Sequence, residues 1–153
     1  MKTLQELVSA LNYATKEQGI DNALDLLSIF TQYQGKDWKQ FYPADPDDFQ
    51  CTTIHKNEYL KLLVIYWNSK RISAKHGHMQ GGGLMRVLTG ELTETRFDPD
   101  DQEKAVGTFN YTPGDLSFIH DALAFHVVKN TTTQAAVSLH LYCAGENSDF
   151  GKI

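Results

Sequence analysis

Residues 76–97 have the sequence HGHMQGGGLMRVLTGELTETRF, and this stretch does most to decide the fold class. Candidate strands at 84–88 and 92–97 lie on either side of Thr89-Gly90, which predicts two short strands joined by a turn. Further strands are expected at 60–66, 76–80, 108–111, 116–119, 124–128 and 135–142, and no helical pattern separates them. Many short strands with turns between them are typical of a barrel or a double-sheet jelly roll.

The first third of the chain has a helical pattern. Thr3 and Glu6 have the spacing of a capping box, and apolar residues follow at helical intervals. A second helix is expected from about Asp21, and a last helical turn just before Pro43. Helices followed by strands predict a single mostly β domain over 1–153, with a helical part at 1–44 that packs on a β-barrel at 49–143.

Composition excludes several classes of protein. The chain has 153 residues, of which 41% are hydrophobic and 22% charged, as in an ordinary globular domain. Its net charge of −5, without a basic cluster, argues against partners such as nucleic acid or an anionic membrane. No apolar run approaches the roughly 20 residues of a membrane helix, and the N-terminus lacks the apolar region of a signal peptide. With only two cysteines, Cys51 and Cys143, the expected location is the reducing cytoplasm. A monomer or small homo-oligomer is expected.

His76 and His78 are the first candidate metal ligands. Residues two apart on a strand point to the same face, so both imidazoles would enter one barrel interior, where they must be hydrogen-bonded or bind a metal. The plainer alternative is a pair of partly exposed strand histidines. Of the glycines that follow His78, Gly83 and Gly90 stand at intervals that resemble the first cupin motif. The second cupin motif is resembled by Gly107, Pro113, Gly114, His126 and Asn130.

Gly83 stands where the common cupin motif has a glutamate ligand. Without that carboxylate, three neutral imidazoles would leave a divalent ion with its full charge and open positions, which favours anionic ligands such as a thiolate. Zinc also accepts three histidines, so this ligand set does not choose the metal.

The C-terminal part carries a more specific resemblance. Ser138, His140 and Tyr142 alternate with two leucines and share one face of the strand at 135–142. Taken alone, this is a half-buried strand with a polar side. Residues 126–142, HVVKNTTTQAAVSLHLY, together with 76–97, resemble the cysteine dioxygenase family, and the likeness extends over about 49–143. The resemblance implies a cupin barrel, also called a double-stranded β-helix.

The resemblance also implies roles for individual residues. The metal ligands of an iron(II) cofactor would be His76, His78 and His126. Tyr142 would be the active-site tyrosine, whose hydroxyl hydrogen-bonds dioxygen or the substrate, with His140 and Ser138 as the relay that orients it. Gly83 matches the position at which some members carry a cysteine crosslinked to that tyrosine, so no crosslink is expected here.

The substrate end departs from the family pattern. The family binds the substrate carboxylate through an arginine or a glutamine just before the strand that ends at Trp67. Residues 49–55 here, FQCTTIH, contain no arginine, and Cys51 or Thr53 aligns with that position. Gln50 and Arg71 are the candidate substrate-binding residues. His55 and Arg86 are further substitutes, although a solvated surface charge is the simpler interpretation of both arginines.

The resulting expectation is an oxidoreductase. It would be a mononuclear non-haem iron(II) thiol dioxygenase that adds both atoms of O2 to the sulfur of a small thiol, cysteine or one like 3-mercaptopropionate, and gives a sulfinate. The alternatives are a metal-dependent cupin enzyme acting on a non-thiol substrate and a non-catalytic cupin that binds a small molecule.

Overall fold

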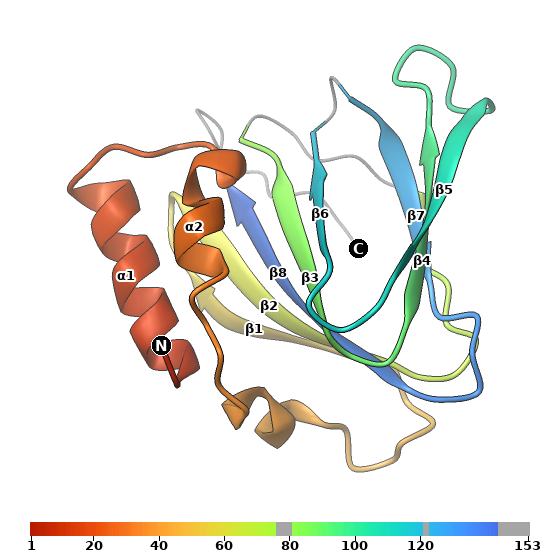
Figure 1. Cartoon of the computed structure of the whole chain (residues 1–153), viewed down its shortest axis with the longest axis horizontal. Helices are drawn as coiled ribbons and strands as arrows, with labels where there is room; N and C mark the ends of the chain where they lie inside the picture. Colours follow the sequence, from red (N-terminus) through yellow and green to blue (C-terminus); the bar gives the residue numbers. More distant parts are fainter. Residues whose placement is uncertain (76–80, 121–122, 144–153) are drawn as a thin grey trace.

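The N-terminal helices form a layer outside a β-sheet (Figure 1). The structure is a computed structural model, and it describes residues 1–75, 81–120 and 123–143. The layer consists of α1 (Leu4–Lys16), η1 (Ala23–Leu26), α2 (Leu27–Phe30) and η2 (Asp37–Phe41). The expected capping box is confirmed: Thr3 Oγ1 accepts from the Glu6 N–H at 3.1 Å, and the Glu6 carboxylate accepts from the Thr3 N–H at 3.3 Å. The expected second helix is divided between η1 and α2 and begins after the N-cap residue Asn22.

Two antiparallel sheets face each other beyond this layer (Figure 1). The larger sheet has the order β1-β2-β8-β3-β6 and the smaller the order β5-β4-β7. In the larger sheet the strands are β1 (Gln50–Lys56), β2 (Leu60–Trp67), β8 (Ala136–Cys143), β3 (Gly83–Thr89) and β6 (Leu116–Ile119). In the smaller sheet they are β5 (Ala105–Tyr111), β4 (Leu92–Phe97) and β7 (Phe125–Lys129). This arrangement confirms the predicted mostly β double-sheet fold with N-terminal helices.

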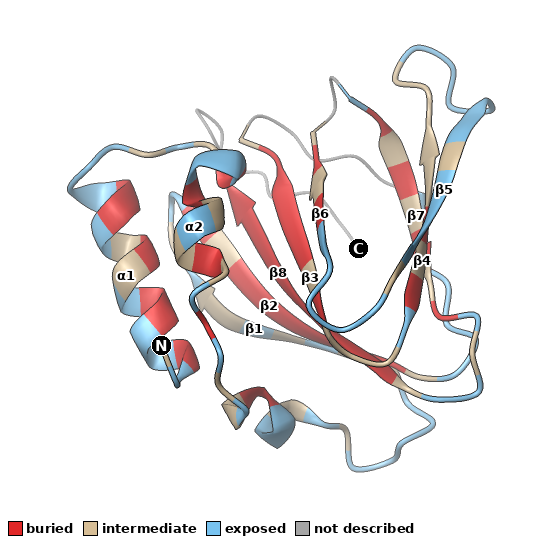
Figure 2. Cartoon of the chain, in the orientation of Figure 1, coloured by how far each residue is buried: buried red, intermediate tan, exposed pale blue. Residues whose placement is uncertain are grey.

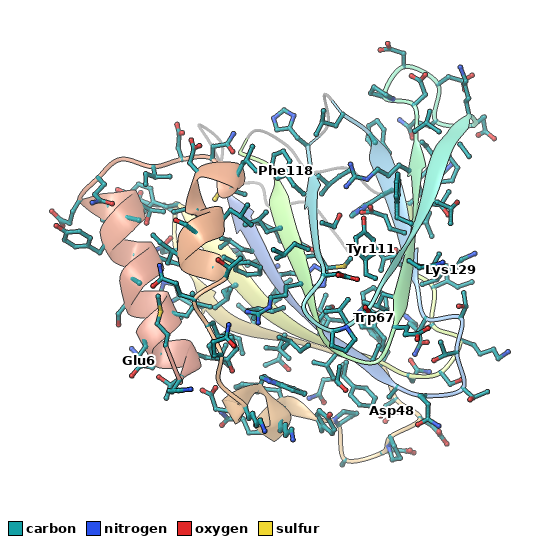
Figure 3. All side chains as sticks on the ribbon, in the orientation of Figure 1. Glu6, Asp48, Trp67, Tyr111, Phe118 and Lys129 are labelled. Atoms are coloured by element: carbon teal, nitrogen blue, oxygen red, sulfur yellow. The ribbon has the colours of Figure 1, made fainter. Side chains whose placement is uncertain are left out.

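Strands β2 and β8 are buried on both faces, as the red colouring shows in Figure 2. On the outer face, Leu62, Leu139 and Leu141 pack with α1 and α2 in one apolar cluster. On the inner face, Leu63, Ile65 and other side chains of the larger sheet meet those of the smaller sheet in a second cluster. Figure 3 shows two of this cluster's aromatic side chains, Trp67 and Tyr111, between the sheets. Alternation along each strand therefore separates an outer structural core from an inner space where polar chemistry can be held.

The predicted strands agree with the observed ones to within about three residues, with two exceptions. The strand β1 was not predicted, because Gln50–Lys56 is polar along much of its length and its burial alternates only weakly. The candidate strand at 76–80 lies outside the described residues.

Two further expectations concern the chain as a whole. None of the helices in the described ranges is long and apolar enough to cross a membrane. The assignment of 1–153 to one domain, with boundaries at 44 and 49, stays a prediction.

Candidate active site

His126 lies on the inner face of the smaller sheet. Its strand, β7, pairs with β4 so that His126 is opposite Arg96, and Val128 is opposite Glu94. Val128 and Leu92 belong to the inner apolar cluster, and alternation places His126, Glu94 and Arg96 on the same face as these two. His126 is only 4% exposed, so its polar ring needs partners in the interior.

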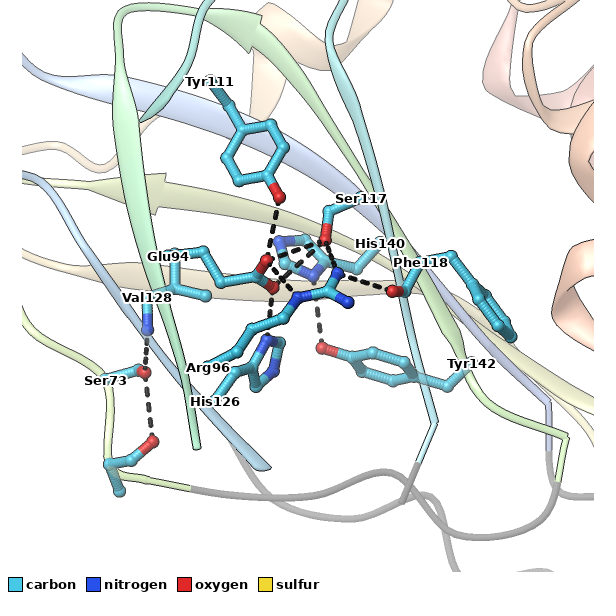
Figure 4. Close-up of polar contacts among 11 residues, drawn as sticks. Ser73, Glu94, Arg96, Tyr111, Ser117, Phe118, His126, Val128, His140 and Tyr142 are labelled. Carbon is cyan, nitrogen blue, oxygen red and sulfur yellow. Dashed lines mark hydrogen bonds and ion pairs between the residues drawn. The ribbon is translucent and has the colours of Figure 1, made fainter. Parts of the chain in front are cut away.

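Glu94 supplies one of those partners. Its side chain has no exposed surface, and its Oε2 accepts a hydrogen bond from His126 Nδ1 at 2.7 Å. Its Oε1 accepts from the Tyr111 hydroxyl at 2.8 Å and from Arg96 Nε at 2.8 Å. The Ser117 hydroxyl lies 3.2 Å and 3.1 Å from the two carboxylate oxygens (Figure 4). Four donors from four strands therefore converge on one buried carboxylate.

Arg96 balances the charge of Glu94. Its Nη2 donates to Ser117 Oγ at 3.0 Å and to the Phe118 carbonyl at 2.6 Å, so the guanidinium is fixed at several points. Its side chain is 20% exposed, while that of Glu94 is fully covered. An ion pair hydrogen-bonded in this way avoids the large cost of a buried lone charge.

The carboxylate also decides the tautomer of His126. Burial opposes ionisation of Glu94, but the hydrogen bonds from His126 and Arg96 and the positive charge beside the carboxylate outweigh burial and hold the pKa of this carboxyl well below its usual value. An ionised carboxylate only accepts hydrogen bonds, so His126 Nδ1 must carry the proton. In the neutral imidazole Nε2 then has the lone pair, which is the form that ligates a metal.

A second polar group lies on the inner face of β8. Ser138, His140 and Tyr142 are paired with Ile65, Leu63 and Lys61 of β2, and all three are buried. Ser138 Oγ lies 2.6 Å from His140 Nε2, and the Tyr142 hydroxyl lies 3.2 Å from His140 Nδ1. The three residues of the expected relay are thus in hydrogen-bonding contact, and their role stays a prediction. The sequence did not suggest a further contact, in which the Trp67 indole N–H donates to Ser138 Oγ at 2.8 Å.

Tyr142 is held as a neutral phenol. Burial raises its pKa well above the ordinary value, with a smaller contribution from Cys51. Gly83 lies directly across from Tyr142 in the pairing of β3 with β8. The residue assigned by resemblance to the crosslinking position therefore stands beside the tyrosine and has no side chain.

The two sides of β1 present different candidates for the substrate. Cys51 pairs with Ile65 and Thr53 with Leu63, which places both on the inner face. Gln50 pairs with Tyr66 on the outer face, and its amide Nε2 donates to the Phe41 carbonyl at 2.7 Å. The structure therefore separates Gln50 from the relay, and its expected contact with substrate stays a prediction.

The remaining candidate substrate-binding residues, His55, Arg86 and Arg71, do not all lie on the same side of the larger sheet. His55 Nε2 lies 3.2 Å from Asn12 Oδ1 of α1, and Arg86 Nη1 donates to the Tyr33 carbonyl at 2.6 Å, so both engage the helical layer. The exposed Arg71 guanidinium stacks 4.1 Å from the ring centroid of Phe49. Phe49 contacts Trp67 edge-on, with 5.6 Å between ring centroids. Arg71 is thus the expected substrate residue that approaches the inner cluster.

Two of the three expected metal ligands, His76 and His78, lie outside the described residues. Among the residues that are described, no group of three or more His, Cys, Asp and Glu side chains is placed to hold a metal ion. The structure therefore positions His126 and its partners, and the complete ligand set stays a prediction.

Sequence reasoning missed Glu94 and Arg96. Both occur in the quoted stretch at 76–97, where TETR looks like an ordinary solvated strand end. The usable signal was alternation: these two charges share a strand face with the buried Leu92.

Comparison with known proteins finds a matching family model and similar sequences. The family model described as cysteine dioxygenase type I matches residues 1–146. Cysteine dioxygenase type 1 of Danio rerio is 28% identical over 150 residues, which cover 92% of this chain and 74% of the relative. The protein of the same name from Rattus norvegicus is 25% identical over 149 residues, with the same two coverages.

Solved structures with less sequence identity share the fold. A double-stranded β-helix protein from Klebsiella pneumoniae has a TM-score of 0.59 at 13% identity, covering 74% of this chain and 90% of its own. The protein TT1209 from Thermus thermophilus has a TM-score of 0.58 at 18% identity, covering 71% of this chain and 94% of its own. These likenesses confirm the cupin, or double-stranded β-helix, fold.

Proposed function

Because the chain belongs to the cysteine dioxygenase type I family, a family of metal-dependent oxidoreductases, we propose that it is a mononuclear non-haem iron(II) thiol dioxygenase. It would add both atoms of O2 to the sulfur of a small thiol and release a sulfinate. One observation carries most of this proposal: His126, oriented by Glu94, and the relay of Ser138, His140 and Tyr142 belong to the inner faces of two opposed sheets.

The donor chemistry around His126 fits a divalent metal. A histidine that donates from Nδ1 to a carboxylate is held in one orientation and is a more basic ligand at Nε2. We assign His126, together with His76 and His78, as the ligands of iron(II). Bound iron(II) would supply the redox chemistry by which dioxygen reacts with a thiol sulfur.

The charges of the chain favour a thiolate as substrate. Arg96 offsets Glu94, and three neutral imidazoles add no negative charge, so the positive charge of a bound ion would not be cancelled by its surroundings. An uncancelled positive charge lowers the pKa of a nearby thiol and stabilises its anion. Gly83, in the position of the usual carboxylate ligand, supports the same conclusion.

Tyr142 would act as a neutral hydrogen-bonding group toward the reactants. Its raised pKa keeps the phenol protonated at neutral pH, and His140 fixes the position of its oxygen. Ser138 and Trp67 in turn hold His140. A hydroxyl held by such a chain is preorganised for the reacting oxygen or sulfur.

For the non-sulfur end of the substrate we propose Arg71 in preference to Gln50. Arg71 stacks on Phe49, which contacts Trp67 of the inner cluster, whereas the Gln50 amide is directed to Phe41. A guanidinium would bind the carboxylate of cysteine or of a thiol such as 3-mercaptopropionate.

Oxygen uptake tests the proposal directly. Iron(II)-loaded protein is supplied with a panel of small thiols that differ in the carboxylate and the amino group, and the product is analysed after reaction in ¹⁸O-labelled dioxygen. We expect thiol-dependent uptake and a sulfinate that carries both labelled atoms. His126→Ala should abolish uptake, while Lys129→Ala, on the same strand, should not. Uptake that no thiol stimulates in the iron-loaded protein would refute the proposal and favour one of the alternative cupin functions.

A further inference from the structure

The hydroxyl of Ser138 has a simple hydrogen-bonding environment. Ser138 is fully buried, and within the described residues its Oγ has two partners, Trp67 Nε1 and His140 Nε2. The indole N–H can donate and cannot accept. Consequently Ser138 accepts from Trp67, and His140 is the one partner that can receive the serine proton.

The two partners of Ser138 Oγ determine which ring nitrogen of His140 carries the hydrogen. If Ser138 donates to Nε2, that nitrogen holds a lone pair, and a neutral ring then carries its hydrogen on Nδ1. The Nδ1–H faces the Tyr142 oxygen at 3.2 Å and donates to it. In the opposite direction, with hydrogen on Nε2, the buried serine hydrogen would have no acceptor, which is unfavourable.

We propose that Trp67 and Ser138 are positioning residues that set the direction of the relay, from Trp67 through Ser138 and His140 to Tyr142. Tyr142 accepts from His140, so its own hydroxyl hydrogen is not used within the relay and is directed to another acceptor. The inference rests on the proposed function in one respect only. If the chain is a thiol dioxygenase, the hydroxyl hydrogen of Tyr142 makes this residue a donor toward the reactants. In the opposite direction Tyr142 would present only lone pairs to them.

The direction can be read from the tautomer of His140. Full-length protein labelled with ¹⁵N-histidine is loaded with zinc(II), a diamagnetic ion suited to histidine ligands, and studied by NMR at a pH of about 8, where free histidine is neutral. The His140 signals are identified by their loss in His140→Gln. We expect the Nδ1–H form in roughly ten-fold excess or more, given the usual cost of an unpaired buried hydroxyl. A predominant Nε2–H form in the unmodified protein would overturn the inference.

Two variants examine the source of the direction. Ser138→Ala removes the donor to Nε2, and Trp67→Phe removes the donor that holds the serine oxygen; each should lower the excess several-fold. Trp38→Phe is the matched control, because the Trp38 indole donates to the Gly35 carbonyl at 3.1 Å in the outer cluster, and it should leave the tautomer unchanged. If the excess of the Nδ1–H form persists in Trp67→Phe, then Trp67 does not help to set the direction of the relay.

The proposed tautomer of His140 and the proposed reaction are refuted by different results. Zinc-loaded protein performs no thiol oxidation, so the NMR result stands or falls on the hydrogen bonds alone. Absence of thiol-dependent oxygen uptake would refute the proposed function while leaving the tautomer measurement intact.

Discussion

Replacing Glu94 by glutamine isolates the electrostatic part of the contact with His126. The side chain keeps its shape, but it loses its charge and one of its two acceptor oxygens. The Arg96 guanidinium can only donate, and His126 Nδ1 must donate if Nε2 is to keep the lone pair for a metal, so the new amide N–H2 cannot serve both of them. The variant therefore weakens the orientation of His126 and leaves Arg96 without its counter-charge.

The expected loss of metal affinity follows from one contact. The 2.7 Å bond between His126 and Glu94 is charge-assisted, and such bonds contribute about 1.5–3 kcal/mol. At about 1.4 kcal/mol per factor of ten, Glu94→Gln should weaken metal binding by about 10–100-fold. The metal-free fold should lose about 2–3 kcal/mol, somewhat less than for a fully buried pair, because the Arg96 side chain is 20% exposed.

Two assays separate these effects. Competition with a coloured chelator measures the affinity for iron(II) or zinc(II), and urea unfolding of the metal-free chain measures stability. Adding Arg96→Met to Glu94→Gln removes the uncompensated cation, so this double variant should regain stability without regaining metal affinity. Glu91→Gln makes the same chemical change at an exposed position and should alter neither quantity.

The refuting result is specific. If Glu94→Gln is folded and binds the metal as tightly as the unmodified chain, then Glu94 does not orient a ligand, and His126 belongs to a structural polar cluster.

Three further changes have expected outcomes. Tyr142→Phe keeps the apolar contacts of the ring, so the free energy of unfolding should change by no more than about 1 kcal/mol, while kcat for thiol oxidation falls by about 10²-fold or more in oxygen-uptake assays. Burial, with a smaller contribution from Asp21, raises the pKa of Cys143 to about 12. Because the folded state favours the neutral thiol, the free energy of unfolding should be at its full value below a pH of about 9 and decline between about 9 and 12. Urea unfolding should show a smaller decline in Cys143→Ala. Thr3→Ala removes the side chain that caps α1 and should lower the free energy of unfolding by about 1 kcal/mol in the same assay, with turnover unchanged in the remaining folded protein.

Much of the fold and the shared face of Ser138, His140 and Tyr142 could be anticipated from local pattern. Strict alternation in SLHLY predicted that Ser138, His140 and Tyr142 share a face, and the structure places them in hydrogen-bonding contact. The capping box at Thr3 was equally local. Such features involve residues close in sequence, whose geometry is set by the period of the strand or helix.

The parts that were missed depend on pairing between distant segments. Glu94 meets His126 from 32 positions away, and Trp67 meets Ser138 from 71 positions away. Alternation with Leu92 indicates the face of Glu94, but its partner His126 is identified only when β7 is laid beside β4. Gln50 illustrates the same difficulty, because its face depends on the register of β1 against β2.

The two-sided burial of β8 has a consequence for how this chain tolerates change in length. Leucines on one side of the strand fit the helices, and the relay on the other side fits the inner space. An insertion or deletion of one residue within 136–143 would exchange the two sets, moving three polar groups beneath the helices and leucines into the reaction space. Insertions and deletions should therefore be tolerated only in the connections around β8. In library design the length of this strand should be kept fixed, because its two faces pack against different surroundings.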